Sequence, residues 1–121
     1  MVGVLVDTSI LIDYLNRVPP AIVELSRYPT VAISTIGWIE VMVGATPASE
    51  VGTRAFLDRF ELVRLDDAVS ERAVRLRRVY RLKVPDAISL ASAQVTGRLF
   101  VTRDAKDFAK IDPSVRIPYK L

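Results

Sequence analysis

The sequence contains neither cysteine nor histidine among its 121 residues. The lack of cysteine excludes disulfides, thiolate metal sites and a cysteine nucleophile, and it fits a reducing compartment such as the cytoplasm. The lack of histidine excludes a Ser-His-Asp triad and the commonest zinc sites, and it removes the usual general base. Any hydrolytic chemistry must therefore use carboxylates, lysine, tyrosine, hydroxyl groups or a metal ion.

Long apolar runs are absent as well. No uninterrupted apolar stretch approaches the roughly 18 residues of a membrane span, so we expect no membrane association. Residues 1–7 lack a basic start and reach an acid at Asp7, unlike a signal peptide. We therefore expect a cytoplasmic protein, and the length fits a single domain over residues 1–121.

Short apolar runs alternate with segments of helical periodicity along the whole chain. This alternation predicts the α/β class, as a three-layer α/β/α domain with a mainly parallel twisted sheet. Thr8-Ser9, Thr35 and Asp66 or Asp67 are candidate helix caps. The predicted strands cover residues 2–6, 31–34, 62–65, 99–102 and 115–118, the last at a sheet edge because of Pro118. The predicted helices begin near residues 8, 20, 35, 46, 66, 85 and 104.

Four carboxylates occur where a predicted strand ends or a predicted helix begins. They are Asp7, Glu40, Asp86 and Asp104. In an open α/β sheet the ligand crevice lies outside the carboxyl ends of the strands, so we expect these acids to converge. Carboxylates without a nearby histidine or cysteine suit a hard cation such as Mg²⁺ or Mn²⁺.

Each of these acids also has a purely structural interpretation. Asp7 could close a turn, Asp86 and Asp104 could cap helices, and Glu40 could face solvent. The joint pattern favours the metal site, because four ionised carboxylates held together would repel one another unless a cation neutralised them.

Hydroxyl side chains lie next to these acids at Thr8, Ser9 and Ser34. They are candidates for binding a water molecule or a phosphate oxygen, and helix capping is the alternative.

The basic residues are mostly arginine, which accounts for 13 of the 17 Lys and Arg residues. Arginine is preferred for phosphate contact, so Arg103 and the arginines of segment 72–81, notably Arg75 and Arg78, are candidate RNA-binding residues. The alternatives are a solvated helix face and a GC-rich genome, which raises arginine content regardless of function.

Four segments resemble, in order, the motifs of PIN-domain proteins: residues 4–13, 34–44, 85–93 and 101–108. Their spacing and the compact length are most similar to the VapC toxins of toxin–antitoxin pairs. The resemblance implies a PIN fold, a Mg²⁺- or Mn²⁺-dependent endoribonuclease, a homodimer and a cognate VapB-like antitoxin.

The resemblance also assigns roles to residues. It implies a catalytic metal site at Asp7, Glu40, Asp86 and Asp104, a hydroxyl role for Thr8 or Ser9, and an auxiliary acid at Asp107. The first three acids would hold one ion, while Asp104 with Asp107 would orient the attacking water or hold a second ion. Whether Asp104 or Asp107 takes the fourth role is open.

Other functions are compatible with parts of the pattern. A phosphatase of the haloacid-dehalogenase type would need a second Asp two residues after Asp7, where this chain has Ser9. A receiver domain would need a lysine after a late strand, where Arg103 precedes Asp104. A housekeeping RNA-processing nuclease, and a metal- or nucleic-acid-binding module without turnover, remain alternatives to the toxin.

Overall fold

The computed structural model describes residues 3–111 and 114–121, so Val2 of the predicted first strand lies outside the described residues. Five strands form one sheet in the order β3-β2-β1-β4-β5, and every neighbouring pair is parallel. The strands are β1 (Val4–Val6), β2 (Val31–Ser34), β3 (Glu61–Val63), β4 (Leu99–Val101) and β5 (Val115–Arg116).

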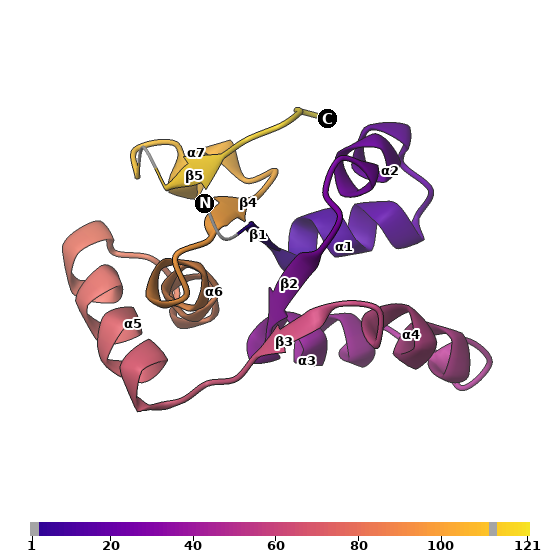
Figure 1. Cartoon of the computed structure of the whole chain (residues 1–121), viewed down its shortest axis with the longest axis horizontal. Helices are drawn as coiled ribbons and strands as arrows, with labels where there is room; N and C mark the ends of the chain where they lie inside the picture. The colour runs from indigo at the N-terminus through magenta and orange to yellow at the C-terminus, as the bar shows by residue number, and fades with distance from the viewer. Residues whose placement is uncertain (1–2, 112–113) are drawn as a thin grey trace.

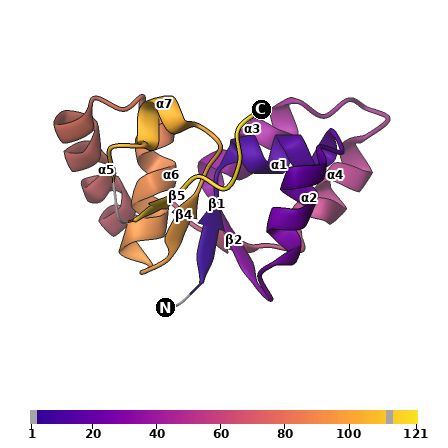
Figure 2. The same cartoon turned by 90° about the horizontal axis from the view of Figure 1, so that it is seen from above.

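Helices cover both faces of this sheet, which confirms the predicted α/β/α architecture (Figures 1 and 2). One face carries α5 and α6, and the other carries α1 to α4. The helices are α1 (Thr8–Leu15), α2 (Pro19–Ser26), α3 (Thr35–Val43), α4 (Glu50–Leu57), α5 (Asp67–Tyr80), α6 (Val84–Val95) and α7 (Ala105–Phe108). No helix in the described ranges has the length and apolar character needed to cross a bilayer.

Two apolar clusters hold the layers together, one on each face. Successive strand residues point to opposite faces of a sheet. Leu5 and Phe100 therefore pack with α5 and α6, while Val4, Val6 and Val101 pack with the helices of the other face. Because the central strands are buried on both faces, they are continuous apolar runs in the sequence.

Polar side chains begin the helices at the carboxyl edge of the sheet. Asp7 caps α1, Ser34 caps α3 and Asp104 caps α7. Asp66 caps α5, as predicted. The predicted caps of α1 and α3 were one residue too late, because the last residue of the extended segment supplies the cap in both helices.

Several predicted boundaries were wrong by a few residues. Helix α4 begins at Glu50, because Thr46 and Ser49 first form a turn in which the Thr46 N–H donates to Ser49 Oγ at 2.9 Å. Helix α6 begins at Val84, so Lys83 is its N-cap and Asp86 lies in its first turn. Strands β3 and β5 each end two residues early, and β5 lies at an edge as predicted.

Candidate active site at the carboxyl edge of the sheet

An open cleft of about 500 Å³ lies at the carboxyl edge of the sheet. Its walls come from the segment after β1, from α3, from the first turn of α6 and from the segment that joins β4 to α7. The lining residues are Asp7, Thr8, Ser9, Glu40, Asp86, Arg103, Asp104, Ala105 and Lys106. The structure thus brings all four predicted acids to one cleft, although they are spread over nearly 100 residues of sequence.

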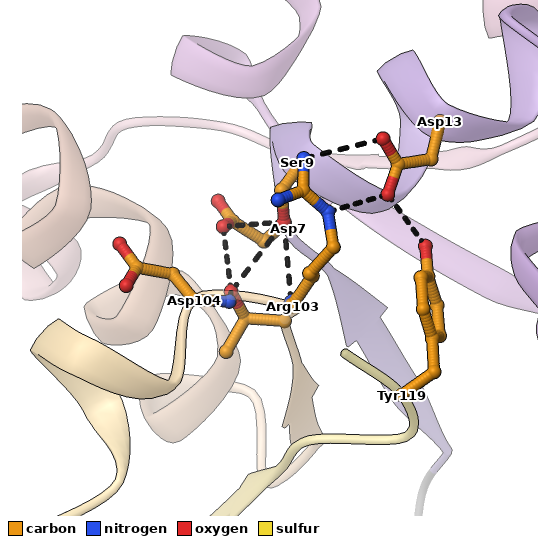
Figure 3. A network of polar contacts seen from close by, with 7 residues as sticks. Asp7, Ser9, Asp13, Arg103, Asp104 and Tyr119 are labelled. Atoms are coloured by element: carbon orange, nitrogen blue, oxygen red, sulfur yellow. Dashed lines mark hydrogen bonds and ion pairs between the residues drawn. The ribbon is translucent and has the colours of Figure 1, made fainter. Parts of the chain in front are cut away.

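Asp7 is the most enclosed of these acids, with only 7% of its surface exposed. Its Oδ1 accepts a hydrogen bond from the Thr8 N–H at 2.9 Å. Its Oδ2 accepts hydrogen bonds from the hydroxyls of Ser9, at 3.1 Å, and Thr102, at 2.8 Å (Figure 3). Burial raises the pKa of the Asp7 carboxyl, and the hydrogen bonds offset this rise only in part. Asp7 therefore caps α1 and lines the cleft at the same time.

Glu40 differs from Asp7 because its side chain is exposed. The hydroxyl of Thr8, itself buried, donates to Glu40 Oε1 at 2.7 Å and so links α1 to α3. Ser34, the third hydroxyl candidate, caps α3 by accepting from the Gly37 N–H at 3.0 Å, and it is not among the cleft residues. Thr8 thus fixes the direction of an acid, whereas Ser34 has the structural role.

Asp86, Asp104 and Asp107 form the tightest acidic group. One carboxylate oxygen from each lies within 4.8 Å of those of the other two. Burial, followed by the charges of the neighbouring acids, raises the pKa of Asp86 to about 6. The pKa of Asp107 is also raised, chiefly by its hydrogen bond with Asp104, while Lys83 and Lys106 act in the opposite direction.

Within the described part of the chain, the acids of the cleft and Asp107 have no lysine or arginine at ion-pair distance. Across residues 3–111 and 114–121, the ion pairs of the structure involve none of the four predicted acids and not Asp107. A group of like charges without a counter-ion, built only from oxygen donors, fits a hard divalent cation. The tight group includes Asp107 and omits Asp7 and Glu40, so the assignment of the individual metal ligands stays a prediction.

The arginines proposed for RNA contact have different surroundings. Arg103 lines the cleft, but its guanidinium forms an ion pair with Asp13, and its backbone N–H donates to Ser9 Oγ at 3.3 Å. Arg75 and Arg78 are exposed on α5 and are not cleft residues. RNA contact by these arginines stays a prediction.

The sequence analysis missed three residues around the site, namely Asp13, Thr102 and Tyr119. Thr102 donates to Asp7, and Asp13 accepts from both Arg103 and Tyr119. Thr102 could have been noticed as a hydroxyl at the end of a strand, and Asp13 as an acid within an otherwise apolar helix. Tyr119 gave no local signal, because its partner is 106 residues away.

Comparison with known proteins identifies the family. The family model described as PIN domain matches residues 4–113. The chain belongs to the PIN-domain family. The resemblance predicted from the four motifs is therefore confirmed. A search of curated proteins returned no match.

Solved structures that resemble this PIN domain include components of toxin–antitoxin complexes. A chain of a toxin–antitoxin complex from Klebsiella pneumoniae is 44% identical, with a TM-score of 0.93, and the match covers 98% of this chain and 99% of the other. DNA-bound VapBC from Salmonella typhimurium is 20% identical, with a TM-score of 0.78 and 96% of each chain covered. Mycobacterium tuberculosis VapC20, described as a sarcin-ricin loop cleaving toxin, is 16% identical with a TM-score of 0.68, covering 88% of this chain and 93% of the other. The last two likenesses show the fold alone.

Proposed function

We propose that this PIN-domain protein is a Mg²⁺- or Mn²⁺-dependent endoribonuclease and the toxin of a toxin–antitoxin pair. The observation that carries the proposal is the convergence of carboxylates from four separate elements on one open cleft without a cationic partner in the described chain. The 44% identity to a chain of a toxin–antitoxin complex supports the toxin role over that of a housekeeping nuclease.

The acids have different roles in this proposal, according to the surroundings of each carboxylate. Asp86, Asp104 and Asp107 are close enough together to hold the cation. A bound Mg²⁺ or Mn²⁺ would neutralise them, activate water and stabilise the charge that develops on a phosphodiester. Asp7, held by Thr102 and Ser9, lines the same cleft and offers a further carboxylate oxygen donor.

Glu40 is suited to accept a proton from the attacking water. Thr8 holds one of its oxygens, and its carboxylate is exposed at the cleft. A positioned, solvent-accessible carboxylate can accept a proton in a chain that has no histidine. Lys106 lines the cleft and, together with Lys83, acts electrostatically on Asp107. Both lysines are therefore placed to attract the RNA backbone.

The toxin role brings further proposals about partners. We place the protein in the cytoplasm with its RNA substrate, as a homodimer inhibited by a VapB-like antitoxin. An extended antitoxin segment that inserts an arginine among the cleft acids would supply the missing cationic partner and block the site. Co-expression with the product of the neighbouring small reading frame tests this, because the antitoxin should co-purify and suppress cleavage.

The activity is tested by incubating the purified protein with structured RNA. Cleavage should require Mg²⁺ or Mn²⁺, stop with EDTA, and fail with Ca²⁺, whose larger and looser coordination positions a nucleophile poorly. Because water is the nucleophile, the products should carry a 5′-phosphate and a 3′-hydroxyl. A 2′,3′-cyclic phosphate, or cleavage undiminished by EDTA, would refute the proposal. Asp7→Ala, purified in parallel, controls for a contaminating ribonuclease.

A further inference from the structure

Arg103 lies between two residues of the site but directs its side chain away from them. It follows Thr102 and precedes Asp104, and its guanidinium reaches back to α1 (Figure 3). There Nε donates to Asp13 Oδ2 at 2.5 Å and Nη2 donates to Asp13 Oδ1 at 3.2 Å. A bidentate pair of this kind fixes orientation as well as distance.

Asp13 is a buried acceptor for this arginine, with 4% of its surface exposed. It also accepts a hydrogen bond from the Tyr119 hydroxyl at 2.8 Å. Burial, then the hydrogen bond to Asp13 and its charge, raises the pKa of Tyr119, and hydrogen bonding to Asp13 raises the pKa of Arg103. Both donors thus keep their protons at neutral pH and remain available to the Asp13 carboxyl.

The backbone beside Arg103 is fastened to the site by a second set of bonds. The Arg103 N–H donates to Ser9 Oγ at 3.3 Å, and the Asp104 N–H donates to Thr102 Oγ1 at 3.1 Å. Thr102 in turn donates to Asp7. The segment 102–104 is therefore held by Asp7 and Ser9 on one side and by the Arg103 side chain on the other.

We propose that Asp13, Arg103 and Tyr119, here called the Asp13 cluster, are positioning residues for the acidic group. Through the backbone of Arg103, the cluster sets the place of Asp104, and Asp104 Oδ1 then accepts from the Asp107 N–H at 3.1 Å. In this arrangement the Arg103 guanidinium binds Asp13 and does not contact the RNA backbone. This inference rests on the proposed function for the role of the acids, but its geometric part can be tested without RNA.

The chain offers a matched control of the same chemistry. Glu24, 3% exposed, accepts from Tyr28 and from two nitrogens of Arg116, at 2.9 and 3.1 Å. These three residues, here called the Glu24 cluster, also join an acid of the first two helices to an arginine and a tyrosine. In the described chain none of their side chains bonds to the segment 102–104 or lines the cleft, and their link to that segment is the backbone bond from the Thr102 N–H to the Arg116 C=O at 3.0 Å.

The test compares Asp13→Asn and Arg103→Gln with Glu24→Gln in the full-length protein. Amide hydrogen exchange, measured without metal, should be faster at Asp104 and Asp107 in the first two variants and unchanged there in Glu24→Gln. Mn²⁺ titration should show affinity weakened about 10- to 100-fold in the first two variants alone, the usual effect of losing an orienting partner. Arg103→Lys, which keeps one ion-pair bond, should recover part of the loss. If Asp13→Asn does not fold, Tyr119→Phe against Tyr28→Phe provides a milder pair.

Kinetics separate positioning from RNA contact. Positioning predicts a fall in kcat with KM for RNA changed by less than about threefold in both Asp13→Asn and Arg103→Gln. Weaker RNA binding in Arg103→Gln, with RNA binding unchanged or tighter in Asp13→Asn, would make Arg103 an RNA contact and overturn the proposal. Equal loss of Mn²⁺ affinity in Glu24→Gln would also overturn it. If the wild type binds Mn²⁺ but does not cut RNA, the proposed function fails, while exchange and titration still decide the positioning role.

Discussion

The acids of this protein fall into two groups with opposite surroundings. Asp13 and Glu24 are buried and each holds an arginine and a tyrosine. Asp86 and Asp104 line an open cleft with Asp107 close to both, and in the described chain the three form no ion pair with an arginine or lysine. The acids of the first group find their hydrogen-bond donors within the fold. The second is left incomplete by the fold, which is what a binding site for a cation requires.

The pKa values of Glu24 and Asp86 show the same contrast. Burial alone would raise the pKa of the Glu24 carboxyl, but the hydrogen bonds from Arg116 and Tyr28, together with the charges of Arg116 and Arg27, outweigh burial and lower it. Burial also raises the pKa of Asp86, and there the neighbouring acids add to the rise, to about 6. The fold therefore stabilises one acid as an ion and destabilises the other.

The largest expected effect is on catalysis. Asp86→Asn should abolish RNA cleavage, because it removes an acid from the tight group, while Glu24→Gln should retain cleavage at a temperature where it is folded. Both substitutions delete one negative charge and keep the side-chain size. The assay is cleavage of one structured RNA in Mg²⁺ by the two variants at equal folded concentration. Full activity in Asp86→Asn would remove this acid from the site.

The same two variants should differ in the opposite sense in stability. Glu24→Gln leaves Arg116 without its carboxylate and should lower the free energy of unfolding by about 2 kcal/mol, since Arg116 is partly exposed and can be rehydrated. Asp86→Asn relieves repulsion and should leave the metal-free protein equally stable or more stable. Urea denaturation in EDTA measures both values. A clear loss of stability in Asp86→Asn would favour a structural role.

The two acids should also give opposite pH dependences. The folded-state pKa of Asp86, about 6, lies above its ordinary value of 3.8, so its ionisation penalty is complete above pH 6 and disappears as the pH falls toward 3.8. The lowered pKa of Glu24 gives a contribution that is present above its ordinary value of 4.5 and lost as the pH falls through the folded-state pKa. The stability gain of Asp86→Asn over wild type, measured in EDTA, should therefore shrink between pH 7 and pH 4. A stability gain of Asp86→Asn that increases as the pH falls would contradict the raised pKa of Asp86.

The smallest effect is expected on RNA binding, when the exposed arginines of α5 are replaced. Arg103 and Arg116 hold buried acids, whereas Arg75 and Arg78 are exposed and form no ion pair within the described residues. Replacing Arg75 and Arg78 together by Gln should weaken binding similarly for unrelated RNA sequences and reduce the salt slope by about one per lost phosphate contact. Filter binding at several salt concentrations measures both. An unchanged slope would assign these arginines to a solvated helix face.

Much of the fold was accessible from the sequence because its signals are local. The buried runs of β1 and β2 and the alternation with helical periodicity indicated the succession of strands and helices along the chain, whereas the order of the strands within the sheet comes from the structure. The start of α4 was wrong because it depends on reciprocal hydrogen bonds between Thr46 and Ser49. The backbone N–H of each residue donates to the side-chain hydroxyl of the other. The buried residues of α5 end at Leu76, so Tyr80, four residues later, is 44% exposed although it continues their helical spacing.

The convergence of the four acids on one cleft was predictable from the sequence, but the hydrogen bonds among their neighbours were not. Position near the end of a predicted strand or the beginning of a predicted helix selected Asp7, Glu40, Asp86 and Asp104. The sequence could not show that Asp7 is held by three donors while Asp86 accepts no hydrogen bond in the described chain. It also could not pair Arg103 with Asp13, because the two are 90 residues apart and only the packed sheet brings them together.

The contrast between acids that have arginine and tyrosine donors and acids that have no cationic partner in the described chain is tested most directly by crystallography. The crystals are grown with Mn²⁺, and the ion is located by anomalous scattering. We expect one or two peaks in the cleft, the first within about 2.0–2.3 Å of carboxylate oxygens from the tight group. No peak should lie at Asp13 or Glu24, whose oxygens already have arginine and tyrosine donors. An empty cleft at saturating Mn²⁺, or an ion bound elsewhere while RNA is still cleaved, would contradict the assignment of these acids as the metal site.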